Sequence, residues 1–165
     1  YGGIMTGGAI QNNTGHRGAA VNIYSDDRDK RAIFTLEDDG LITRNTGISA
    51  NGNEAGGAVF VEDNAAFHMI GGTVSANKAS KGGGICIVDS ALQRGTAEYG
   101  TEFLMDGGVI SGNRAGTGGG IYSFSNGSFL RSGKIINNTA TYSGGGLYSE
   151  GKALMVTALP IYIIP

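Results

Sequence analysis

The sequence predicts an all-β protein: a parallel β-helix (β-solenoid) built from five to six coils of about 25 residues, with two loop insertions. Three observations predict this fold. An imperfect repeat runs along the chain, glycine accounts for 31 of the 165 residues, and apolar residues alternate within each repeat. Helical repeats are disfavoured because each interior Gly costs about 1 kcal/mol relative to Ala. Alternation of apolar residues, as at Ile85 and Ile87, is typical of strands.

Each repeat is anchored on an asparagine that follows an apolar residue by three positions and precedes a glycine-rich cluster. The clearest copies end at residues 77, 113 and 138, and two weaker copies end at residues 13 and 51. The spacings of 38, 26, 36 and 25 residues predict a coil of about 25 residues. The two long spacings predict insertions of 11 to 13 residues, at residues 24–37 and 89–100. We expect the asparagines to form a structural ladder, with members Asn13, Asn51, Asn77, Asn113 and Asn138.

The glycine clusters are expected at corners between strands, where positive φ is needed and neighbouring coils approach closely. Recurrence in successive repeats and the lack of a following Lys-Ser or Lys-Thr argue against phosphate-binding loops. The corner positions are Gly83, Gly84, Gly119, Gly120, Gly145 and Gly146. An inward asparagine in each coil must satisfy its hydrogen bonds internally, so the ladder is interpreted as structural rather than ligand-binding.

The pattern of Ile or Val, then Asn, then Gly-Gly-Ala/Gly-Ile/Val resembles the repeats of bacterial surface and autotransporter adhesins. It is similar to the repeats of the polymorphic outer membrane proteins of chlamydiae, which have Phe where this chain has Ile or Val. The fuller pattern Phe-x-Met-x-Gly-Gly-x-Ile-Ser-x-Asn is similar to repeat-bearing surface proteins of gut bacteria. The resemblance covers roughly residues 1–150. It implies a right-handed β-helix outside the cell with adhesive or display roles and no catalytic residues.

One acidic region offers candidate binding chemistry. Its carboxylates are those of Asp26, Asp27, Asp29, Asp38 and Asp39. Such oxygen-rich clusters suit Ca²⁺ as a cofactor, and paired carboxylates also serve acid–base catalysis. The favoured interpretation is a solvated, self-compensated loop, because basic residues are interleaved at positions 28, 30 and 31. His16, His68 and Cys86 do not have transition-metal ligand spacing, so we expect no metal site and no catalytic site.

The predicted function is a non-catalytic structural and adhesive segment of a secreted or cell-surface bacterial protein. The alternative is a carbohydrate-active enzyme, a pectate-lyase-like polysaccharide lyase or hydrolase acting in a groove along the solenoid. Expected partners are a host-cell or extracellular protein or a glycan. The net charge of −2 predicts no nucleic-acid partner.

Two units are expected along the chain. Residues 1–152 form the repeat domain, and residues 153–165 form an apolar C-terminal cap or an artificial chain end. This apolar stretch is shorter than the roughly 20 residues of a membrane-spanning helix, so no direct membrane span is expected. Solenoid ends expose strand edges, which makes end-to-end self-association a further expectation.

Overall fold

A computed structural model of the chain describes residues 2–27, 29–48, 56–89, 100–150, 154–157 and 161–164. These residues form 19 strands and no α-helix, and the strand pairs are parallel throughout. The chain is therefore all-β, with strands of successive repeats lying side by side rather than folding back as hairpins. This arrangement is compatible with a β-solenoid.

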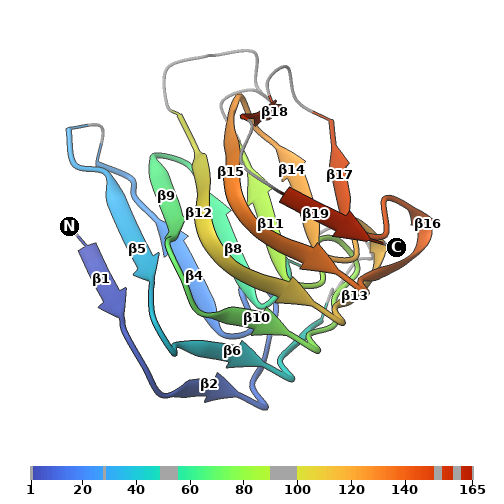
Figure 1. The fold of residues 1–165 in the computed structure, drawn as a ribbon. Coiled ribbons are helices and arrows are strands. Elements are labelled where there is room, and N and C mark those ends of the chain that lie inside the picture. Colours follow the sequence, from blue (N-terminus) through green and yellow to red (C-terminus); the bar gives the residue numbers. More distant parts are fainter. Residues whose placement is uncertain are drawn as a thin grey trace.

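The largest sheet, sheet A, has two arms that meet at a bend (Figure 1). The first arm contains β1 (Gly2–Met5), β5 (Ala32–Leu36), β9 (Ala65–Met69), the start of β12 (Glu102–Ser111), the start of β15 (Gly127–Ile136) and β18 (Leu154–Val156). The second arm contains β2 (Ala9–Gln11), β6 (Leu41–Thr43), β10 (Thr73–Ser75), the ends of β12 and β15, and β19 (Ile161–Ile164).

Two further stacks complete the arrangement. Sheet B contains β3 (Thr14–Gly15) paired with β7 (Thr46–Gly47), and β13 (Arg114–Thr117) paired with β16 (Thr139–Ser143). Isolated bridges through Lys78 join these two pairs. Sheet C contains β4 (Val21–Tyr24), β8 (Val59–Glu62), β11 (Ile85–Val88), β14 (Ile121–Phe124) and β17 (Leu147–Ser149). The strands run from blue at one end of the stack to red at the other (Figure 1).

Side chains from sheets A and C share one hydrophobic core because alternate residues of each strand point inward. Equivalent residues of successive repeats lie next to each other in this core. Phe34, Phe67 and Phe103 stack, with ring centroids 6.1 Å and 5.6 Å apart. A parallel row of Ile42, Val74, Ile110 and Ile135 is fully buried. The repeat in the sequence is thus a repeat in packing.

The structure corrects the predicted extent of the first insertion. Residues 32–36, which the sequence analysis placed inside it, form strand β5 and pair with β1 and β9. Only the segment between β4 and β5 is a loop. The second predicted insertion, at residues 89–100, lies mostly outside the described residues. In the C-terminal region, β18 and β19 add to sheet A beside β15, and a capping role for residues 153–165 remains a prediction.

Candidate functional site

The asparagine ladder lies where the second arm of sheet A turns into sheet B. Its members are Asn13, Asn45, Asn77, Asn113 and Asn138. In each step the backbone N–H and the Nδ2 of one asparagine donate to the Oδ1 of the next, over 2.9–3.0 Å. The Nδ2 also donates back to a main-chain carbonyl of the preceding repeat, over 2.9–3.1 Å. Four of the five are buried, so the ladder fulfils its hydrogen bonding inside the fold.

The second rung corrects the sequence analysis, because Asn45 occupies the position assigned to Asn51. Asn51 lies outside the described residues. The apolar residue three positions earlier is accordingly Ile42, which pairs with Ile10 and Val74. The ladder spacings become 32, 32, 36 and 25 residues.

The residue immediately before each ladder asparagine has positive φ. These residues are Asn12, Arg44, Ala76, Gly112 and Asn137, with φ between 54° and 64°. The left-handed conformation costs an L-residue roughly 1–2 kcal/mol, except that Asn tolerates it better. The turn therefore recurs even where the local residue, Ala or Arg, is unsuited to it, because the ladder and the flanking strand pairs determine the chain direction.

The glycine clusters lie at the corner between sheets B and C. A Cβ built on Gly83 would be 2.5 Å from two carbonyl oxygens, and one on Gly119 would be 2.4 Å from two. A Cβ on Gly84 would be 2.8 Å from the carbonyl oxygen of the equivalent glycine in the next repeat, and one on Gly120 would be 2.5 Å from its equivalent. Gly145 is less crowded, because a Cβ there would have its nearest neighbour, the Asn138 carbonyl oxygen, at 3.0 Å. These glycines therefore permit the main chains of neighbouring repeats to stack closely.

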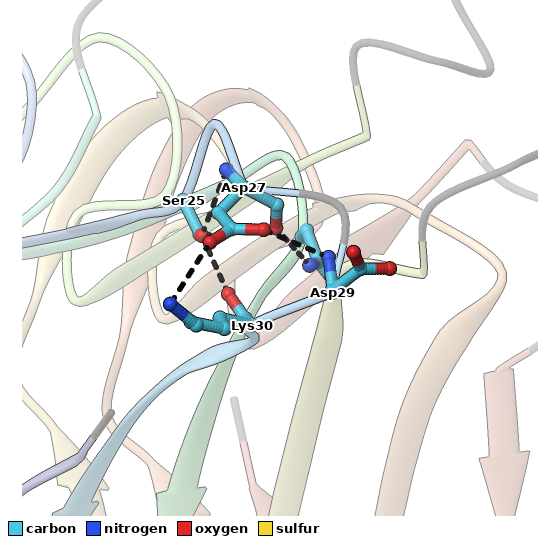
Figure 2. A network of polar contacts seen from close by, with 5 residues as sticks. Ser25, Asp27, Asp29 and Lys30 are labelled. Atoms are coloured by element: carbon cyan, nitrogen blue, oxygen red, sulfur yellow. Dashed lines mark hydrogen bonds and ion pairs between the residues drawn. The ribbon is translucent and has the colours of Figure 1, made fainter.

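The acidic loop between β4 and β5 is held by its own hydrogen bonds (Figure 2). The Asp27 carboxylate accepts the Asp29 main-chain N–H at 3.0 Å and lies 3.6 Å from Lys30 Nζ. Ser25 Oγ donates to the Lys30 carbonyl at 2.6 Å and accepts the Asp27 N–H at 3.3 Å. Figure 2 shows Lys30 and Asp29 beside Asp27, which fits the self-compensated loop that the interleaved charges predict.

The five candidate carboxylates are not brought together. Asp26, Asp27 and Asp29 precede β5, whereas Asp38 and Asp39 follow it at the bend of sheet A. Asp38 has φ of 46°, and its carbonyl accepts the Gly72 N–H, so its role there is in the turn. Among the residues that the structure describes, no three His, Cys, Asp or Glu side chains are grouped closely enough to hold a metal ion. Binding of Ca²⁺ remains an untested prediction.

Two polar clusters, one centred on the half-buried Glu102 and one on the buried Glu62, were not predicted. Glu102 accepts a hydrogen bond from Arg31 at 3.2 Å and lies 2.9 Å from His68 Nε2, on the outward face of the first arm of sheet A. Arg17 Nη1 donates to both carboxylate oxygens of Glu62, at 3.1 Å and 2.9 Å. Their members are 34 to 71 residues apart in sequence, so only the strand register could have identified them.

Sheet C carries a second apolar row on its outer face, formed by Phe60, Cys86, Tyr122 and Tyr148. The Tyr122 and Tyr148 rings stack at 5.6 Å, and Lys81 Nζ lies 4.9 Å from the Tyr122 ring centroid. Burial raises the pKa of the Cys86 thiol to about 12. Burial and a 2.6 Å hydrogen bond to Glu150 raise the pKa of the Tyr122 hydroxyl. Neither group is a nucleophile near neutral pH.

Comparisons with known proteins give no relative to guide assignment: no family model, no curated protein and no solved structure matches the chain. No helix long and apolar enough to cross a membrane occurs in the part of the chain that the structure describes.

Proposed function

We propose that the chain is a right-handed parallel β-helix of five to six coils that acts as a non-catalytic structural and adhesive scaffold. The observation that supports this most directly is the asparagine ladder. Its buried amides bond to one another and to the main chain over four consecutive steps, so they support the stack rather than a ligand. The parallel strand stacks and the shared core are the arrangement that such a scaffold needs.

The side faces and the loops are the surfaces that this scaffold would present. We propose that it belongs to a secreted or cell-surface bacterial protein, on the strength of the adhesin-like repeat pattern. Its partner would then be a host-cell or extracellular protein or a glycan, with neither nucleic acid nor a membrane span involved. The outermost strands of sheet A, β1 and β2 at one end and β18 and β19 at the other, offer edges for end-to-end self-association.

A polysaccharide panel tests the proposal. The protein is incubated with each polysaccharide, with and without Ca²⁺, and both its retention and the release of new reducing or unsaturated ends are recorded. Retention without product is expected of an adhesive scaffold. Product formation that EDTA abolishes would favour the pectate-lyase-like alternative and make Asp26, Asp27 and Asp29 the first residues to mutate.

A further inference from the structure

Positive charge collects along the corner that contains the asparagine ladder. We define this ladder corner as the five stacked segments 9–17, 41–48, 73–81, 109–117 and 134–143. These segments contain none of the chain's 14 Asp and Glu residues. They contain six of its 12 Lys and Arg residues, namely Arg17, Arg44, Lys78, Lys81, Arg114 and Lys134. Although the whole chain has a net charge of −2, all the Asp, Glu, Lys and Arg positions of this corner are Lys or Arg.

Four of these cations are exposed at the ladder corner, in three different register columns, and we call them the cationic row: Arg44, Lys78, Arg114 and Lys134. Lys78 and Arg114 are register partners in neighbouring repeats, where strands lie about 4.8 Å apart. Lys134 precedes the buried Ile135 in β15, so alternation turns its side chain outward. Arg44 donates hydrogen bonds to the side chains of Asn12 and Gln11, which hold its guanidinium on this surface.

Among the residues that the structure describes, the cationic row differs from most other cations in lacking acidic partners. Arg17, Lys30, Arg31 and Arg131 each form an ion pair with a carboxylate. For Arg44, Lys78, Arg114 and Lys134, no described carboxylate lies within ion-pair distance. Unpaired side chains of one sign in a row produce a local positive potential that the net charge of the whole chain conceals.

Hydroxyl groups flank Lys78 and Arg114 in their register column. Thr14, Thr46 and Thr139 occupy the same register column as Lys78 and Arg114 in the other repeats. Thr14 and Thr139 are exposed, and Thr46 is half-buried. Hydroxyls can donate to or accept from the hydroxyl groups of a sugar, while Arg binds carboxylate and sulfate through paired N–H groups.

We propose that the cationic row binds an anionic polysaccharide, a glycan carrying carboxylate or sulfate groups, laid along the stacking direction. This rests on the proposed adhesive function and names the chemistry of its partner. Lys78 and Arg114 are adjacent in one register column and have threonine hydroxyls on either side, which matches a polymer chain that carries both charged and hydroxyl groups. Single-stranded nucleic acid fits less well, because binding without sequence preference uses several stacking aromatic side chains. The ladder corner has one Tyr, Tyr142, and no Phe or Trp.

The test compares two double variants that each remove two positive charges. Lys78→Gln with Arg114→Gln alters the cationic row, whereas Lys30→Gln with Arg131→Gln alters cations that are paired elsewhere. Binding of the full chain to heparin, alginate, neutral dextran and an oligothymidylate is measured by biolayer interferometry. We expect heparin and alginate to bind, the first variant to lose about tenfold in affinity, and the second to change less than about twofold. Binding should weaken as salt rises.

Several outcomes would overturn the inference: equal losses in both variants, dextran bound as tightly as alginate, or oligothymidylate bound more tightly than either anionic glycan. All four altered side chains lie at the surface. A thermal melt of each variant is the control for retained folding. Failure here leaves the proposed function standing if the protein is retained by another matrix without product. Release of new sugar ends would instead contradict the scaffold function, while binding of anionic glycans by the cationic row would stay supported.

Discussion

Two corners of the repeat turn the chain through positive φ, the ladder corner in five repeats and the glycine corner in four of those described, yet they differ in the residues they accept. At the ladder corner, the turning position holds Asn12, Arg44, Ala76, Gly112 or Asn137. At the glycine corner between sheets B and C, it is Gly18, Gly82, Gly118 or Gly144. The φ values are nearly the same, 66° at Gly118 and 64° at Gly112. Backbone conformation by itself therefore does not explain why only one of the corners is restricted to glycine.

The difference lies in the space around the Cβ. A Cβ on Gly118 would be 2.4 Å from the Ile121 carbonyl oxygen, whereas one on Gly112 would meet nothing closer than the Ala76 nitrogen at 3.9 Å. At the ladder corner the turning residue faces outward, whereas at the glycine corner it lies against the first residue of the following strand. Contact with the neighbouring main chain selects glycine more strongly than φ does.

Substitution by alanine at the two corners should give the largest contrast. Gly118→Ala combines left-handed strain with a main-chain collision, and we expect a loss of about 4 kcal/mol in the free energy of unfolding. Gly112→Ala carries the strain alone and should cost about 1 kcal/mol. Chemical denaturation of both variants measures the difference. Equal losses would show that φ, not Cβ clearance, determines the glycine requirement.

Removing a rung from the ladder should have the next largest effect. Asn113→Ala leaves the buried N–H and Nδ2 of Asn77 without their acceptor, so we expect a loss of about 3 kcal/mol. Asn13→Ala is the matched control at the exposed end and should cost below about 1 kcal/mol. If the two variants unfold at the same denaturant concentration, the ladder does not stabilise the stack as proposed.

Cys86 lies two residues after the glycine cluster of its repeat, so the ionisation of its thiol tests the packing next to the glycine corner. Its pKa is raised from 9.0 to about 12, so the folded state favours the neutral thiol. This contribution to stability is complete below pH 9.0 and is lost as pH rises toward about 12. Unfolding free energies measured from pH 8 to 10.5 should fall more steeply for the wild type than for Cys86→Ala. Parallel curves would contradict the burial of this thiol.

The smallest expected effect is a gain. Ala76→Gly relieves left-handed strain at φ 54° but increases the flexibility of the unfolded chain, so we expect a net stabilisation of about 0.5 kcal/mol. Ala79→Gly, at a buried position of the same repeat, should destabilise instead. A loss of stability in Ala76→Gly would mean that the alanine side chain contributes packing at the ladder corner.

The sequence predicted an all-β chain with parallel strands, because a period of two and recurrent glycines constrain it strongly. It did not identify the second rung, since Ile42 with Asn45 and Ile48 with Asn51 both fit the spacing of three. A shared Asn-Thr-Gly at residues 13–15 and 45–47 was the distinguishing signal, and these segments do pair as β3 and β7. Spacing alone could not choose between two equivalent matches.

The candidate sites were less predictable for a different reason. The acidic residues are close in sequence, but β5 separates Asp29 from Asp38, so sequence proximity overstated their grouping. Conversely, the net charge gave no sign of the cationic row, whose members Lys78 and Arg114 are brought together only by strand register. Charge patterns in stacked repeats have to be read across the repeats rather than along the chain.

The hydrogen bonds from one ladder asparagine to the next all run one way. Each asparagine amide donates toward the following repeat and accepts from the preceding one, so the side-chain dipoles add up along the stack. The two sides of a repeat are therefore not equivalent: its ladder oxygen faces the preceding repeat, and its amide donors face the following one. The stack is polar along its length, and an additional repeat would meet different hydrogen-bonding groups at its two ends.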